Sequence, residues 1–154
     1  MAVQLRPYAP SDFDKLYTLD HQCFPRGIAY SQRMLAYFLR MPQGHCIVAA
    51  DGAEADAEIV AFLITEEDAP LGHILTLDVA GSHRRLGLGT QLLARGEEEM
   101  AARGVREVLL ETGIDNQAGV AFWQRHGYRT EDILKGYYLG RLDAYRMRKK
   151  IIAL

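Results

Sequence analysis

Two strand-like segments that enclose an amphipathic helix, between residues 73 and 111, constrain the fold of this chain most. The segments 73–80 (HILTLDVA) and 105–111 (VREVLLE) are typical of strands. Between them, small or apolar side chains recur at helical spacing on one face of a helix over 88–103: Leu88, Leu92, Leu93, Gly96 and Met100. A strand, a helix and a strand in this order predict two parallel strands joined by a right-handed crossover.

The segments before this unit predict further strands and helices. In order, we expect a strand over 3–6, a helix over 9–24 with Ser11 as its N-cap, a loop over 24–31, a helix from the cap Ser31 to about Arg40, and strands over 45–51 and 58–67. The last two strands flank a turn rich in Ala, Asp and Gly, which predicts an antiparallel hairpin.

The segments after this unit complete the pattern. A helix is expected from about Gln117 to Arg125, followed by strands over 128–134 and 142–150. Together with the crossover, these elements predict an α/β protein with a central mixed sheet and helices on both faces.

Length and composition indicate one globular domain over residues 1–154. The net charge of −2 gives no basic field for nucleic acid. The sequence has no apolar run of about 18–20 residues and no apolar signal region at its start, so we expect a cytoplasmic protein without a membrane partner. The basic residues near the end are expected to be a solvated strand face: Arg141, Arg146, Arg148, Lys149 and Lys150.

The turn over 84–89 (RRLGLG) has the character of an anion-binding site. Glycines let successive backbone N–H groups face one point, and the dipole of the following helix favours negative charge there. The P-loop pattern is absent, because no Lys-Ser or Lys-Thr follows either glycine, and the dinucleotide pattern lacks its third glycine at Leu92. The turn therefore predicts either a pyrophosphate site or a solvated surface turn with exposed arginines.

Two long segments resemble the GNAT superfamily of N-acetyltransferases: LDVAGSHRRLGLGTQLL (77–93) and LLETGIDNQAGVAFWQRHGY (109–128). The resemblance implies a mostly antiparallel sheet with one parallel strand pair splayed around acetyl-CoA, and no metal. In the family, the first strand pairs with the pantetheine arm and the glycine-rich turn binds the pyrophosphate. The residues that the resemblance assigns to the donor are Leu77, Asp78, Val79, Arg84, Arg85, Leu86, Gly87, Leu88, Gly89, Thr90, Asn116 and Trp123.

Three segments narrow the resemblance to the ribosomal-protein-alanine N-acetyltransferases and their relatives that act on protein N-termini: CFPRGIAYS, GHILTLDVAGSHRRLGLG and KGYYLGRLDAYRM. This branch implies a protein or peptide N-terminus as acceptor. Either a monomer or a homodimer is compatible with the sequence. Its neighbours would be Phe24, Pro25, Tyr30, Tyr137 and Tyr138. The alternative is that Phe24 packs in the core and that Tyr137 and Tyr138 are ordinary strand aromatics. A small amine or a lysine side chain as acceptor, or a silent acyl-CoA-binding module, are the alternative functions.

The resemblance also implies which groups carry the chemistry. Glu111 occupies the family's carboxylate position and would deprotonate the amine, directly or through a water that His73 helps to hold. The backbone N–H groups of 77–79 would polarise the thioester carbonyl. Asn116 would bond the pantetheine arm, cap the next helix, or do both.

Two departures from the family pattern bear on this assignment. Trp123 stands where many members carry a tyrosine that protonates the leaving thiolate. Indole cannot serve as that acid, so either Tyr138 replaces it or a thiol with a pKa of about 8.5 leaves unaided. The stretch before Asn116 is Gly113-Ile114-Asp115, whereas the ribosomal branch often has Arg-x-Ser there.

Overall fold

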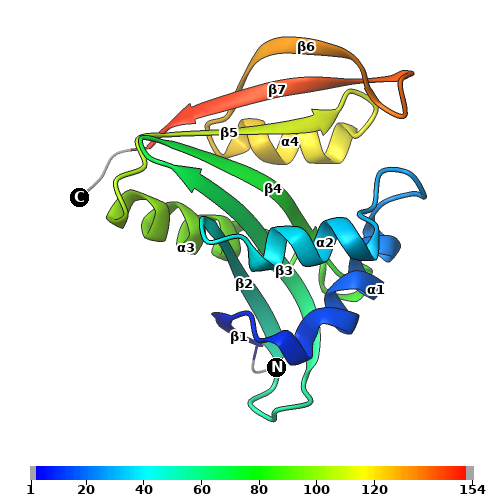
Figure 1. The fold of residues 1–154 in the computed structure, drawn as a ribbon, viewed down its shortest axis with the longest axis vertical. Helices are drawn as coiled ribbons and strands as arrows, with labels where there is room; N and C mark the ends of the chain where they lie inside the picture. The colour runs from blue at the N-terminus through cyan, green and yellow to red at the C-terminus, as the bar shows by residue number, and fades with distance from the viewer. Residues whose placement is uncertain (1–2, 152–154) are drawn as a thin grey trace.

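Residues 3–151 are described by a computed structural model, in which seven strands form one twisted sheet (Figure 1). The strands are β1 (Val3–Pro7), β2 (Gly44–Asp51), β3 (Glu58–Asp68), β4 (Leu71–Val79), β5 (Glu107–Gly113), β6 (Arg129–Tyr138) and β7 (Leu142–Lys150). Their order across the sheet is β1-β2-β3-β4-β5-β7-β6, and every neighbouring pair except β4 and β5 is antiparallel. The expected mixed sheet with one parallel pair is confirmed.

Helices cover both faces of the sheet, as the sequence predicts (Figure 1). They are the short 3₁₀ helices η1 (Pro10–Asp12) and η2 (Gly81–His83) and the α-helices α1 (Phe13–Cys23), α2 (Gln32–Arg40), α3 (Leu88–Ala102) and α4 (Gln117–Arg125). The buried residues of α3 are the five that the helical spacing selects: Leu88, Leu92, Leu93, Gly96 and Met100. Ser31 caps α2 as expected, because its Oγ accepts a hydrogen bond from the backbone N–H of Met34 at 3.1 Å.

The predicted cap at Ser11 is wrong. Ser11 lies inside η1, and the helix proper begins only at Phe13. The carboxylate of Asp12 shapes this start: it accepts hydrogen bonds from the backbone N–H of Ala9 at 2.8 Å and from the guanidinium of Arg6 at 2.8 and 2.9 Å. The ion pair of the buried Asp12 with Arg6 therefore outweighs the capping preference of the serine.

Three of the five basic residues near the end, Arg146, Arg148 and Lys149, are ion-paired, which corrects the expectation of a solvated face for them, whereas Arg141 and Lys150 are exposed. Arg148 contacts Glu107 at 2.9 Å and Glu131 at 2.8 Å, and Lys149 contacts Glu97 at 2.8 Å. These pairs connect β7 to β5, β6 and α3. Cys23 and Cys46 are free thiols.

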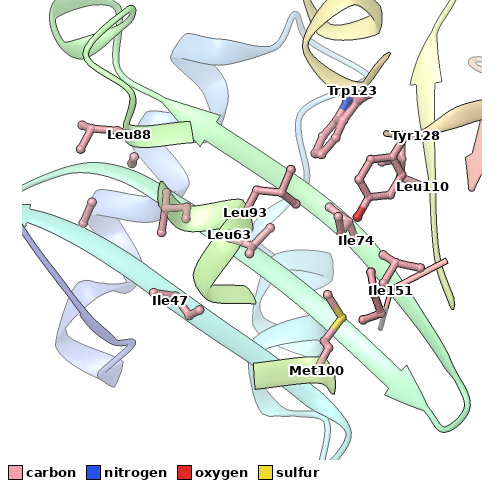
Figure 2. Close-up of a cluster of buried hydrophobic side chains, with 14 of the residues drawn as sticks. Ile47, Leu63, Ile74, Leu88, Leu93, Met100, Leu110, Trp123, Tyr128 and Ile151 are labelled. Carbon is pink, nitrogen blue, oxygen red and sulfur yellow. The ribbon is translucent and has the colours of Figure 1, made fainter. Parts of the chain in front are cut away.

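Two hydrophobic cores lie on opposite faces of the sheet. Figure 2 shows part of the first, where Leu63 of β3 lies beside Leu93 of α3, and Trp123 of α4 lies beside Tyr128 with ring centroids 5.4 Å apart. The second core lies beneath α1 and α2 and includes Phe62 of β3. The sheet therefore separates α3 and α4 from α1 and α2.

The parallel pairing of β4 and β5 is short. It consists of three residue pairs, Leu71–Glu107, Gly72–Val108 and His73–Leu109. Beyond them the strands diverge (Figure 1). The register of β3 against β4 pairs Ile64 with Thr76 and Thr65 with Ile74, which leaves Leu75 as an extra, bulged residue just after the divergence begins. A bulge bends a strand and increases its twist, so β4 turns away from β5 at this point.

Close packing holds the paired end of β4 and β5 in place. A Cβ on Gly72 would come within 2.8 Å of Met100 Sδ and 3.0 Å of Val105 Cγ1. Glycine at this position therefore lets the end of α3 and its following loop lie directly against the three-residue pairing. The divergence of the strands starts from a rigid base.

Candidate active site

The divergence leaves an opening between residues 74–79 of β4 and residues 110–113 of β5, called the β4–β5 opening below. Strand edges without a partner strand present backbone N–H and C=O groups that an extended ligand can bind. The Leu75 carbonyl accepts a hydrogen bond from Tyr30 Oη at 2.9 Å, and the Val79 carbonyl accepts one from Arg84 Nε at 3.2 Å. The opening thus lies between the loop that carries Tyr30 and the glycine–arginine turn.

Glu111 lies in this opening. Val108 and Leu110 of the same strand point into the core beneath α3, so Glu111 projects from the opposite face, where α1 and α2 lie. Its side chain is only 7% exposed, and its Oε1 lies 2.7 Å from Nε2 of His73. The structure therefore brings together the two residues that the sequence assigns to the base.

Charges around Glu111 keep it ionised despite its burial. Burial raises the pKa of Glu111, but the hydrogen bond and charge of His73, with the charge of Arg146 behind them, outweigh burial and lower it overall. Burial likewise lowers the pKa of His73, but the hydrogen bonds and charges of Glu111 and Glu66 outweigh it and raise that pKa. The pair thus favours a carboxylate on Glu111 and a proton on the imidazole.

One oxygen of Glu111 remains free to bind a further donor. Oε2 lies 3.5 Å from Arg146 Nε, an ion-pair distance, and it accepts no hydrogen bond from any residue that the structure describes. A buried carboxylate oxygen without a donor is costly in free energy. An ammonium group or a water molecule bound in the opening would satisfy it.

Tyr137, rather than Tyr138, contacts the carboxylate. Tyr137 Oη donates to Glu111 Oε1 at 3.3 Å, and the ring of Tyr138 packs edge-on against that of Tyr137 with centroids 4.8 Å apart. Burial, followed by the charge of Glu111, raises the pKa of Tyr137. Burial, followed by interaction with Tyr137, raises the pKa of Tyr138. Both phenols are therefore neutral hydrogen-bond donors at physiological pH.

The residues predicted to surround the acceptor lie on two segments that meet near the opening. One is the loop 24–31, which carries the half-buried Phe24 and the exposed Pro25. The other is the end of β6, which carries Tyr137 and Tyr138. The two segments meet where the loop faces the turn after β6, since a Cβ on Gly27 would come within 2.7 Å of Leu139 Cδ2. Tyr30 fixes the loop to the sheet through its bond to Leu75. The structure thus groups these residues on the face of the sheet that carries Glu111.

The glycine–arginine turn presents an uncapped helix end. Arg85 and Gly87 both have left-handed backbone conformations, with φ of 66° and 80°. No side chain caps α3, and its first turn holds no acidic residue, so the N–H groups of residues 88–90 are available. A Cβ on Gly87 would meet only open space, whereas one on Gly89 would come within 3.2 Å of Phe122. Gly87 therefore shapes the turn, and Gly89 lets α3 lie close to α4.

Two residues that the resemblance assigns to the donor, Asn116 and Trp123, make structural contacts within the protein. Oδ1 of Asn116 accepts a hydrogen bond from the backbone N–H of Gly119 at 3.0 Å and so caps α4. The indole of Trp123 is only 8% exposed and lies in the core beside Tyr128 (Figure 2). At the expected tyrosine position, the chain thus has a core side chain.

Sequence reasoning missed Glu66 and Arg146. Glu66 faces His73 in the β3–β4 register, and Arg146 faces Glu111 in the β5–β7 register. The short turn between β3 and β4 could have predicted the first pair. The second pair depends on which strand lies beside β5, which the order of segments does not state.

A buried carboxyl pair lies at the base of the loop 24–31. Asp20 and Asp78 are each 1% exposed. Asp78 Oδ1 accepts a hydrogen bond from Thr76 Oγ1 at 2.5 Å, and Asp20 Oδ2 accepts one from the backbone N–H of Tyr30 at 2.7 Å. Burial, followed by the neighbouring carboxyl of Asp20, raises the pKa of Asp78 well above its ordinary value. The side chain of Asp78 thus belongs to the anchoring of the loop.

Residues 3–151 contain neither a membrane-spanning helix nor a cluster of metal ligands. None of the helices there has both the length and the apolar composition needed to cross a membrane. In the same range, no three His, Cys, Asp or Glu side chains gather as metal ligands would.

Comparison with known proteins identifies relatives along most of the chain. The model of the acetyltransferase (GNAT) family matches residues 13–128. N-alpha-acetyltransferase 30 of Schizosaccharomyces pombe is 30% identical over 118 residues, which are 76% of this chain and 79% of the relative. An N-alpha-acetyltransferase of Sulfurisphaera tokodaii is 25% identical over 150 residues, covering 89% of this chain and 86% of the relative.

Solved structures share the fold. The crystal structure of the ribosomal-protein-S18-alanine N-acetyltransferase from Escherichia coli superposes with a TM-score of 0.85 at 22% identity. The match covers 99% of this chain and 96% of that one. The seven-stranded sheet with its single parallel pair is therefore the fold of this group of proteins.

The carboxyl pair predicts how stability depends on pH. An unfolded aspartate titrates near pH 3.9, whereas Asp78 in the folded protein holds its proton to higher pH. The folded state thus binds more protons than the unfolded state above that pH, so its stability falls as pH rises. Asp78→Asn keeps the acceptor for Thr76 without titrating. In urea unfolding, we expect this variant to lose less stability than the parent between pH 5 and pH 8.

The exposed Asp68 provides the control, since Asp68→Asn should leave the pH dependence as it is in the parent. An Asp78→Asn variant that loses as much stability as the parent over this range would show that the carboxyl pair does not hold an extra proton.

Proposed function

This chain belongs to the GNAT family of acetyltransferases, and from this membership we propose that it acetylates the α-amine at a protein or peptide N-terminus. It is an N-acetyltransferase with acetyl-CoA as its donor. The observation that carries the proposal is the buried Glu111 carboxylate in the β4–β5 opening, bonded by His73 and Tyr137 and with one oxygen free. The names of the two N-alpha-acetyltransferase relatives support this acceptor class.

The described residues fit acetyl-CoA. The uncapped N–H groups of residues 88–90 and the left-handed turn before them suit a pyrophosphate. The free edge of β4, residues 74–79, suits the amides of a pantetheine arm, which would take the place of a neighbouring strand. These two features lie in sequence along β4 and the turn, so a single extended donor could occupy both.

Acetyl-CoA supplies an acetyl thioester, which a neutral amine can attack directly within one complex of enzyme, donor and acceptor. Glu111 removes the proton from the acceptor ammonium, directly or through one water bound at Oε2. His73 holds Glu111 by its 2.7 Å hydrogen bond. The backbone N–H groups of Leu77 and Val79, which alternate with the β3-bonded Asp78 and so face the opening, polarise the reacting carbonyl.

The lowered pKa of Glu111 favours an α-amine over a lysine side chain. An α-amine titrates near 7.7–8.0, so roughly a tenth is already neutral at pH 7, whereas a lysine near 10.4 is almost wholly charged. A carboxylate held ionised by His73 and Arg146 is a weak base. It is therefore matched to the acceptor that loses its proton more easily.

Tyr138 is the proposed partner of the leaving sulfur. Trp123 lies in the core and has no acidic proton of useful pKa. Since burial raises the pKa of Tyr138, this phenol donates a hydrogen bond rather than a full proton. A thiol with a pKa of about 8.5 leaves readily as a thiolate under these conditions.

A peptide panel tests the acceptor class. Thiol release from acetyl-CoA is measured with short peptides that have a free N-terminus, with the same peptides blocked at the N-terminus but containing an internal lysine, and with polyamines. We expect turnover only with free N-termini. Turnover confined to the blocked peptides or polyamines would instead assign the enzyme to side-chain or small amines. Donor binding without any turnover would indicate a silent acyl-CoA-binding module.

The role of Glu111 is tested by Glu111→Gln. We expect kcat to fall by about 10²–10⁴-fold, the usual contribution of a positioned base, while the KM for acetyl-CoA stays unchanged. Glu107→Gln, on the same strand but paired with Arg148, is the matched control and should retain kcat. A Glu111→Gln variant with parental kcat would place the base elsewhere.

The glycine–arginine turn is tested by Gly87→Ala. A non-glycine residue in the left-handed region costs about 1–2 kcal/mol. If the donor requires this conformation, calorimetry should show acetyl-CoA binding weakened about tenfold. Gly140→Ala is the matched control, because Gly140 has a φ of 70°, open space around its Cβ and a place far along the chain from the turn. Equal affinities in both variants would argue against the turn as the pyrophosphate site.

A further inference from the structure

Glu66 is a carboxylate near the site that has no part in the role proposed for Glu111. It lies on β3 opposite His73, and its side chain is 33% exposed. The next residue, Glu67, forms ion pairs with His45 and Arg103. Within residues 3–151, the only ion pair of Glu66 is the one with His73, at 3.1 Å between Oε1 and Nδ1. Its position therefore serves the imidazole.

Glu66, His73 and Glu111 form a continuous line of hydrogen bonds. His73 Nδ1 lies 3.1 Å from Glu66 Oε1, and His73 Nε2 lies 2.7 Å from Glu111 Oε1. With both nitrogens on carboxylate oxygens, a flip of the ring would break both contacts. The line also leads from the buried Glu111, 7% exposed, to the more accessible Glu66, 33% exposed.

We propose that Glu66 is a positioning residue that fixes His73 against Glu111 and provides the outlet through which the acceptor's proton reaches solvent. This inference rests on the proposed function. Above its raised pKa, His73 is neutral, with its one proton on Nδ1 facing Glu66. Glu111 takes the ammonium proton and passes it to Nε2, and Nδ1 releases its own proton to the carboxylate of Glu66, which passes it to water. After the product leaves, Nε2 loses its proton through Glu111 to water in the emptied opening and Nδ1 regains one from solvent through Glu66. One proton moves from acceptor to solvent, and the nitrogen keeps the electron pair that forms the new bond to carbon.

The charges around His73 determine how the removal of Glu66 would act. Glu66 faces the ring from β3 and Glu111 faces it from β5. Arg146 of β7 and Tyr137 of β6 reach it only through Glu111. The two carboxylates raise the pKa of His73 against its burial. Without the charge of Glu66, His73 would bind a proton more weakly and the line would be a poorer base.

The first measurement is an NMR titration of the His73 ring in the parent and in Glu66→Gln, with the resonance assigned from His73→Gln. Glutamine keeps an oxygen that can accept from Nδ1 but removes the charge. We expect the pKa of His73 to fall in Glu66→Gln. The control is Glu58→Gln, an exposed residue of the same strand, which should leave the titration unchanged. An unchanged pKa of His73 in Glu66→Gln would overturn the inference.

The second measurement is the pH profile of kcat at saturating donor and acceptor. On the alkaline plateau, we expect the kcat of Glu66→Gln to be about tenfold lower, which is a small part of the contribution of a positioned base. We also expect the acid limb of the profile to move to lower pH. The KM for acetyl-CoA should not change. A parental profile would exclude the proton outlet. The titration needs no acceptor, so its result does not depend on which acceptor the enzyme uses. Failure of this inference can therefore be told apart from failure of the proposed function.

Discussion

The site depends on how soon the parallel pairing between β4 and β5 ends. Three residue pairs join the strands, and Gly72 lets α3 pack directly against them. After them, the bulge at Leu75 turns β4 away, and β5 continues against β7 along its whole length. A longer ladder would close the space in which Glu111 lies. The main functional element of the fold is therefore a place where regular hydrogen bonding stops.

Burial of a carboxylate in that space has to be compensated. Ionised groups in a poorly solvated site are unstable unless opposite charge and hydrogen bonds surround them. Glu111 receives these from three strands: His73 on β4, Tyr137 on β6 and Arg146 on β7. The same contacts that make the carboxylate tolerable also limit its basicity, and this links the stability of the sheet to the choice of acceptor.

Much of the fold follows from local sequence patterns, and most of what was missed depends on long-range contacts. The buried face of α3 and the Ser31 cap could be predicted because spacing and capping are local properties. The Ser11 cap failed because Arg6 and Asp12 form an ion pair that capping preferences do not include. The resemblance to a known family suggested Glu111 and His73. The contact of Arg146 with Glu111 could not be predicted, because it depends on β7 lying beside β5.

Segments from different parts of the chain lie at the acceptor side and at the donor side of the site. The loop 24–31 and the turn at Leu139 come from the two ends of the sequence and meet on one face of the sheet. The glycine–arginine turn and α3 come from the middle, and α3 packs on the other face. On the proposed function, the ends of the chain select the acceptor and the middle holds the donor. Changes in the terminal segments would then alter which acceptor binds without disturbing the site for acetyl-CoA.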